Sequence, residues 1–90
     1  MKCESRAQWK EAHEKARAFL EKEGVTLKHI SQDELPQYAG GLFVAVPPKD
    51  FQGPTFEVAG QRCLYQHSYP SDCAMGAWRV LTGAAWDAWP

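Results

Sequence analysis

Residues 72–89, DCAMGAWRVLTGAAWDAW, decide the fold of this chain. Ser71 and Asp72 bring side-chain oxygens that can cap a helix N-terminus, and no proline interrupts the residues that follow. Apolar residues then recur at intervals of three and four, which is typical of one face of a helix. Many of the others are alanine, glycine or cysteine, so the helix backbone can lie close to a sheet. The pattern predicts that residues 72–89 form a C-terminal helix with a Trp-rich tail, packed on a sheet, with Trp78 and Trp86 filling the gaps.

The N-terminal part of the chain predicts a second helix. Ser5 with Gln8 three residues later fits a capping box, and Gly24 ends the periodic stretch. The apolar face repeats at helical spacing and consists of Trp9, Ala12, Ala16, Phe19 and Leu20. The opposite face is charged and includes two pairs of opposite charge four residues apart, Glu11 with Lys15 and Arg17 with Glu21.

Two stretches between these helices read as strands. Residues 25–30 alternate between apolar and polar side chains, as a half-buried strand does. Residues 42–46, LFVAV, are apolar without alternation, which suits a strand covered on both faces. We therefore expect residues 42–46 to be the central strand of the sheet.

A hairpin follows the central strand. Residues 55–58 and 61–66 have strand composition and flank Ala59 and Gly60, which is the length of a tight turn with a glycine available for positive φ. The residues expected to face the helices are Phe56, Val58 and Leu64. The whole chain, residues 1–90, is predicted to be a single α+β domain with a mostly antiparallel three- to four-stranded sheet, covered by an N-terminal and a C-terminal helix.

Composition narrows the classes of function. Hydrophobic residues make up 44 %, aromatic residues 12 % and charged residues 23 %, which is a globular composition. Ten basic and eleven acidic residues give a net charge of −1, which disfavours a duplex nucleic-acid binder and a nucleic-acid mimic alike. No apolar run approaches membrane-spanning length, and three irregularly spaced cysteines indicate reduced thiols. We expect a soluble cytoplasmic protein with no membrane contact.

One cluster carries nucleophile or metal-ligand chemistry. A thiol at a helix N-terminus, such as Cys73, has its pKa lowered by the helix dipole, and His67 is close enough in sequence to act as a base. A thiol enzyme using both is one alternative function, and a metal protein that adds Cys63 and either Cys3 or His29 is another. The acidic residue before Cys73 opposes thiolate formation, and paired metal-ligand spacing is lacking. We predict ordinary thiols, no enzyme activity, no metal and no cofactor.

An aromatic row offers a different alternative. Tyr65, His67 and Tyr69 alternate, so in an extended segment they project from one face. Such a row can stack single-stranded bases, but only Arg62 and Arg79 lie nearby to neutralise phosphates. A single-stranded nucleic-acid accessory module is therefore kept as an alternative, and nucleic acid ranks below protein as a partner.

Four tryptophans in ninety residues cannot all be central in so small a core, so some are expected at the surface. Tryptophan is enriched at binding hot spots, and the two nearest the end of the sequence are the strongest candidates. The predicted partner-binding residues are Trp86, Trp89, Phe51, Tyr69, Tyr65 and Arg79. Three alternatives remain open: the two tryptophans cap a thin core, Phe51 tucks onto the core, or a homodimer buries these aromatic side chains.

In size, aromatic richness, lack of catalytic signatures and compact helix–sheet layout, the chain resembles small accessory proteins of phages and mobile elements such as anti-CRISPR inhibitors. The resemblance implies a protein that acts stoichiometrically by occupying a surface of a larger host or defence complex. The near-neutral charge departs from those inhibitors that imitate DNA. We therefore expect a small protein-binding or inhibitory module with aromatic contact residues.

Overall fold

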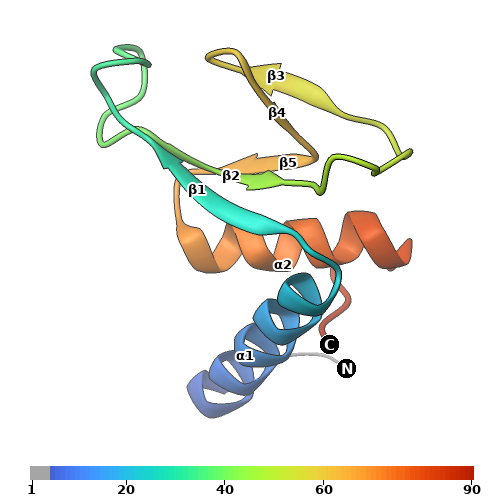
Figure 1. The fold of residues 1–90 in the computed structure, drawn as a ribbon. Coiled ribbons are helices and arrows are strands. Elements are labelled where there is room, and N and C mark those ends of the chain that lie inside the picture. Colours follow the sequence, from blue (N-terminus) through green and yellow to red (C-terminus); the bar gives the residue numbers. More distant parts are fainter. Residues whose placement is uncertain (1–4) are drawn as a thin grey trace.

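The computed structural model of the chain describes residues 5–90. These residues form two helices and five strands, in the order α1 (Arg6–Lys22), β1 (Thr26–Ile30), β2 (Leu42–Val46), β3 (Phe56–Val58), β4 (Gln61–Cys63), β5 (Tyr65–His67) and α2 (Pro70–Thr82). Figure 1 shows both helices on the same side of the strands. The predicted α+β class, with antiparallel pairing and a helix toward each end of the chain, is confirmed.

The central strand is β2, as predicted. It pairs antiparallel with β1 on one side and with β5 on the other. The consecutive residues Val44 and Ala45 point to opposite faces of the sheet, and both are fully buried. Ala45 packs with α2 residues, whereas Val44 packs on the other face with Cys63 of β4. Both faces of β2 are therefore covered.

The second strand of the predicted hairpin is divided into two strands that belong to different sheets. Residues 61–66 were expected to form one strand, but the chain bends at Leu64, whose backbone N–H donates to the Ala45 carbonyl at 2.9 Å. Before the bend, β4 pairs with β3 as a separate two-stranded ribbon; after it, β5 joins β2. The ribbon lies on the face of the sheet away from the helices (Figure 1). Phe56 in β3 is consequently 42 % exposed and does not face the helices as expected, whereas Leu64 does pack with α2.

The turn of the ribbon matches its sequence. Ala59 has φ of 50° and Gly60 has φ of 78°, and β3 and β4 pair antiparallel on either side of them. Two consecutive positive φ values are what a type I′ two-residue hairpin turn requires. The predicted hairpin at Ala59 and Gly60 is therefore confirmed, with Ala59 in a conformation that favours glycine.

The start of α1 is also as predicted. Ser5 is the N-cap, and its Oγ accepts a hydrogen bond from the Gln8 backbone N–H at 3.2 Å. The side of α1 that faces the rest of the molecule is buried at Ala12, Ala16 and Leu20. Small residues at the first two positions bring α1 close to Met75 of α2.

The bounds of α2 differ from the prediction at both ends. Pro70 occupies the first turn, where its missing N–H costs nothing, and the N-cap Tyr69 makes no side-chain capping bond. The helix ends at Thr82 because Gly83 is left-handed, with φ of 71°, and donates its N–H to the Arg79 carbonyl at 2.9 Å. The helical face was predicted to continue past Gly83, and this is wrong: Gly83 is a C-cap and not a small packing residue.

The expected close approach of α2 to the sheet is observed. Five consecutive residues of α2 are buried, from Cys73 to Ala77. A Cβ atom at Gly76 would overlap the ring of Tyr65 in β5. The absence of a side chain at Gly76 therefore lets the Tyr65 ring lie directly on the helix backbone.

Candidate functional site

The segment that follows α2 turns back along the helices and is held there. The Nε of Arg79 donates to the carbonyl oxygen of Ala88 at 2.9 Å, and its guanidinium carbon lies 5.3 Å from the ring centroid of Trp89. The N–H of Ala88 donates to the carbonyl of Ala85, which closes a turn between them. Trp89 itself packs on the contact between α1 and α2, which consists of Ala12, Ala16 and Met75. Trp89 is therefore a structural residue in this fold.

Trp86 lies within that closed turn and has the opposite environment. Its side chain is 84 % exposed, the most exposed of the large hydrophobic residues described. The left-handed Gly83 precedes it and the Arg79 contacts with Ala88 and Trp89 follow it, so both ends of the segment that carries Trp86 are held. The two tryptophans that sequence reasoning paired thus have different roles: one supports the fold and the other is displayed to solvent.

A shallow pocket of about 480 Å³ adjoins Trp86. Its lining residues come from α2, from β5 and from the segment after α2, and they are Tyr65, Gly76, Arg79, Val80, Ala84 and Trp86. Val80 is 46 % exposed, which adds apolar area beside the indole. We call these six residues the Trp86 surface. Three of the six, Tyr65, Arg79 and Trp86, are contacts predicted from the sequence.

The remaining predicted contacts lie elsewhere. Phe51 is half-buried and packs on the helix-side core, and the guanidinium of Arg62 donates to its carbonyl oxygen at 2.7 Å. Tyr69 is 63 % exposed but precedes α2, whereas Trp86 follows it. Thirteen helical residues separate the two, or about 20 Å at ~1.5 Å per residue. Phe51 and Tyr69 therefore do not belong to the Trp86 surface.

The thiols are buried. Cys63 and Cys73 are both inaccessible to solvent, and the thiol of Cys73 lies 3.5 Å from the Phe43 carbonyl. Burial, reinforced by the nearby Cys63, raises the pKa of Cys73 to about 12. The helix N-terminus was expected to lower this pKa, and desolvation reverses the direction. Cys73 therefore lacks the thiolate that a nucleophile needs.

His67 faces the start of α2. Its Nδ1 accepts the backbone N–H of Tyr69 at 3.2 Å and lies 4.0 Å from Oδ2 of Asp72. His29 is on the opposite edge strand, where its Nε2 lies 2.8 Å from the Gly40 carbonyl. Within residues 5–90, no three His, Cys, Asp or Glu side chains come together in a way that could hold a metal ion. Cys3, the other ligand considered from the sequence, lies outside the described residues.

The aromatic row does not form an open stacking face, because Tyr65 and His67 both point toward α2. The Tyr65 ring lies against Gly76, whereas His67 and Tyr69 form their own pair with ring centroids 5.9 Å apart. Arg62 is turned inward, toward the carbonyl oxygens of Pro48 and Phe51. These side chains do not form one stacking face with a cation beside it.

Two exposed aromatic residues were not among the contacts predicted from the sequence. Tyr38 and Phe56 are 39 % and 42 % exposed and line a pocket of about 300 Å³ between the β1–β2 loop and the ribbon. The signal for Phe56 was hidden because the bend at Leu64, which moves the ribbon away from the helices, has no local signature. Tyr38 had the clearer signal, because a single aromatic residue within a loop rich in turn formers indicates exposure at the surface.

No family model, curated protein or solved structure matches this chain. Among residues 5–90, neither helix combines the length and the hydropathy that crossing a bilayer requires.

Proposed function

We propose that this chain is a small, non-enzymatic protein-binding module whose contact surface is the Trp86 surface. The observation that carries the proposal is the exposed indole of Trp86 on a segment held at both ends. Tryptophan is the residue type most enriched at binding hot spots, and hot spots fill pockets at the centre of an interface. The apolar side chain of Val80 and the adjoining hollow extend the contact around it.

The held conformation strengthens the proposal. A contact residue on a free segment loses conformational entropy on binding, about 0.5–1.5 kcal/mol for each immobilised side chain and more for its backbone. Arg79 and Trp89 fix the segment before any partner arrives. Folding has therefore already ordered the segment that carries Trp86, so binding a partner costs less conformational entropy.

The partner we propose is a protein surface of a larger host or defence complex, occupied stoichiometrically as by the phage and mobile-element inhibitors that the chain resembles. A net charge of −1 supports recognition by shape and apolar contact over recognition by a strong field. Turnover is disfavoured because the two described thiols are buried and the pKa of Cys73 is raised to about 12. Neither alternative, thiol chemistry or single-strand binding, gains an observation of its own.

Affinity capture from bacterial lysate tests the proposal. Three tagged forms are compared: the parent, Trp86→Ala, and Tyr69→Ala, whose removed ring is also exposed but lies at the other end of α2. Retained proteins are quantified by mass spectrometry, and each candidate is then purified and mixed with the parent. A partner that forms a 1:1 complex with the parent and Tyr69→Ala, and is lost with Trp86→Ala, supports the proposal. A partner retained equally by Trp86→Ala overturns the assignment of the surface.

Self-association is examined on the same three forms. Light scattering after gel filtration gives the mass of each in solution. If the parent is a dimer and Trp86→Ala is a monomer, the Trp86 surface joins copies of this chain, and the proposal of a foreign partner is wrong.

A further inference from the structure

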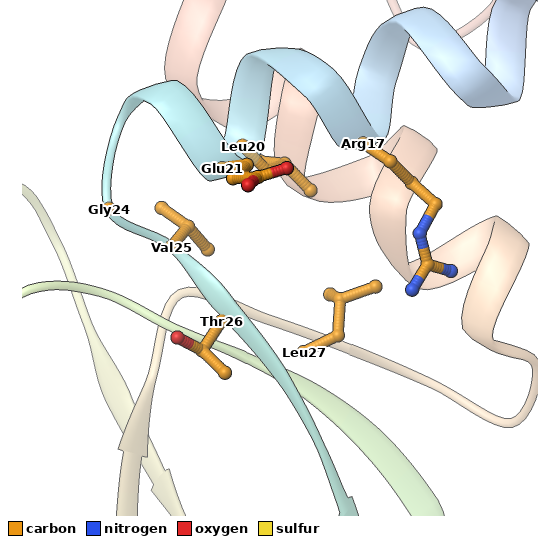
Figure 2. A pocket seen from close by; sticks show the side chains of 7 residues that line it. All are labelled: Arg17, Leu20, Glu21, Gly24, Val25, Thr26 and Leu27. Atoms are coloured by element: carbon orange, nitrogen blue, oxygen red, sulfur yellow. The ribbon is translucent and has the colours of Figure 1, made fainter.

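A second pocket lies between the C-terminal half of α1 and the start of β1, away from the Trp86 surface. Its volume is about 410 Å³, and it is lined by Arg17, Leu20, Glu21, Gly24, Val25, Thr26 and Leu27. Figure 2 shows these side chains around the point where the chain leaves α1 and enters β1. We call it the Arg17 pocket.

The guanidinium of Arg17 has no acidic partner in the part of the chain that the structure describes. Glu11 and Lys15 form the ion pair expected from their spacing, at 3.2 Å. Arg17 and Glu21 have the same spacing, but no ion pair within 4.0 Å joins them among residues 5–90. Figure 2 shows the Arg17 side chain extending away from Glu21, toward Leu27 of β1. Because the guanidinium of Arg17 does not pair with Glu21 and lines a pocket, it can pair with an anionic group of another molecule.

The pocket also has an apolar floor. Leu20 is 2 % exposed and Val25 is 7 % exposed, and Leu27 is half-buried. An occupant that satisfies both features carries an anionic group next to an apolar one. A free carboxylate suits a guanidinium well, because two parallel N–H···O bonds can form between them.

The open edge of β1 adds an independent constraint. In the sheet order β1-β2-β5, β1 is an edge strand and, among residues 5–90, pairs with β2 alone, so its other edge can pair with an added strand. This edge begins at Thr26 in the Arg17 pocket and carries a second cation, Lys28, at its centre. An extended peptide can therefore lie along β1 with one end in the pocket.

Charge decides the direction of such a peptide. A strand antiparallel to β1 ends at Thr26, which places its C-terminal carboxylate beside Arg17. A parallel strand begins there and places its ammonium beside the guanidinium, although Glu21 on the other side of the pocket offsets part of that repulsion. Arg17 therefore favours the antiparallel arrangement, whereas Lys28, in the middle of β1 and bonded through Nζ to Oε1 of Gln61 at 3.1 Å, does not distinguish the two directions. A second copy of this chain, paired β1 to β1 about its centre, sets Lys28 opposite Lys28 and is disfavoured.

We propose that the Arg17 pocket and the edge of β1 together bind the free C-terminus of a partner protein in extended conformation. The terminal carboxylate pairs with Arg17, the apolar side chain of the last residue occupies the floor of Leu20, Val25 and Leu27, and the preceding residues add to β1 as an antiparallel strand. This site is separate from the Trp86 surface and does not depend on the function proposed for it.

The test selects ligands from a library of random hexapeptides displayed with free C-termini. The best peptide is then synthesised as a fluorescent free acid and as the C-terminal amide, and both are titrated by fluorescence anisotropy. We expect the selected sequences to end in an apolar residue, and amidation to weaken binding at least tenfold. Arg17→Gln should weaken binding of the free acid by a similar factor. Lys10→Gln, the same change of charge elsewhere on α1, should not, and neither should Trp86→Ala.

Amide resonances locate the peptide. Binding should shift the backbone amides of Thr26–Ile30 and leave those around Trp86 unchanged. The proposal is overturned if selection yields no C-terminal preference, if acid and amide bind equally, or if the shifts fall outside β1 and the Arg17 pocket. Binding that requires a free peptide N-terminus and not a free carboxylate would also overturn the proposal. It would show that the peptide runs parallel to β1 with its ammonium group next to Glu21.

Discussion

Arg79 donates a hydrogen bond from Nε to the carbonyl oxygen of Ala88, nine residues later in the chain, at 2.9 Å. The same guanidinium lies over the ring of Trp89. One side chain of α2 therefore fixes the segment that displays Trp86, and the predictions about that segment depend on it.

Replacing Arg79 with alanine should free the segment. A hydrogen bond from a charged donor contributes about 1.5–3 kcal/mol and an exposed cation–π contact about 0.5–1 kcal/mol, so for this half-exposed side chain we expect a loss of about 1–2 kcal/mol in the free energy of unfolding. Urea unfolding measures the loss. In protein labelled with 5-fluorotryptophan, the ¹⁹F line of Trp86 should narrow in Arg79→Ala, and an unchanged line would show that the segment is held by other contacts. Lys10→Ala, which removes an exposed cation of α1, is the control.

The two tryptophans should differ in their effect on stability. Trp89→Ala removes a ring packed between the helices, and we expect it to lower the free energy of unfolding by about 2–3 kcal/mol, somewhat less than a fully buried aromatic residue costs. Trp86→Ala removes a ring that contacts mainly solvent and should change it by less than about 0.5 kcal/mol. Urea unfolding of both variants decides the matter, and equal losses would mean that Trp86 is part of the core.

His13 should make stability depend on pH. Its Nε2 is buried without a hydrogen-bond partner, and its ring is 5.4 Å from that of Trp9. Burial lowers the pKa of His13 below 6.5, and the charge of Arg17 lowers it further, against the raising effects of Glu14 and Asp72. Because the folded state binds its proton less readily than the unfolded state, this contribution to stability is fully present above pH 6.5 and is lost as pH falls through the folded pKa.

Unfolding in urea at pH 7.5 and pH 5.0 measures this dependence. The His13→Gln variant should lose less stability than the parent between the two values. A parent and variant with the same pH dependence would show that His13 is readily protonated in the folded protein.

Cys73 should be protected from alkylation. Because its pKa is raised to about 12 and its side chain is buried, iodoacetamide should react with it at pH 8 only as fast as the protein opens. The experiment uses Cys3→Ser protein, so that labelling reports Cys63 and Cys73 alone. Rapid modification of Cys73 in the folded protein, confirmed by peptide mass, would revive the thiol as a reactive group.

The elements that could be predicted from the sequence are those with local causes. Ser5 with Gln8 specified the start of α1, because a cap is made by residues three apart. The two-residue spacer of Ala59 and Gly60, with its glycine, specified the hairpin between two stretches of strand composition. The unbroken apolar run of β2 indicated a strand covered on both faces, and burial of both Val44 and Ala45 confirms it.

The parts that could not be predicted depend on distant contacts. Nothing near Leu64 shows that the chain bends there, since the bend is stabilised by a hydrogen bond to Ala45 in another strand. A glycine at position 83 is compatible with close packing inside a helix and also with the end of a helix, and the sequence alone does not distinguish these roles. Once it ends α2, the roles of Trp86 and Trp89 follow from the contact of Arg79 with Ala88, which no sequence period encodes. Half of the residues of the Trp86 surface could therefore be predicted from their residue type, but their arrangement in space could not.

The most direct test of the central claim is isothermal titration of the purified partner, once captured, with the parent and with Trp86→Ala. Equal melting temperatures of the two forms must first show that the fold is unchanged. A hot-spot residue contributes about 2 kcal/mol or more to the free energy of binding. Trp86→Ala should therefore raise the dissociation constant at least about thirtyfold. An unchanged dissociation constant would contradict the claim that Trp86 is the contact through which this protein binds.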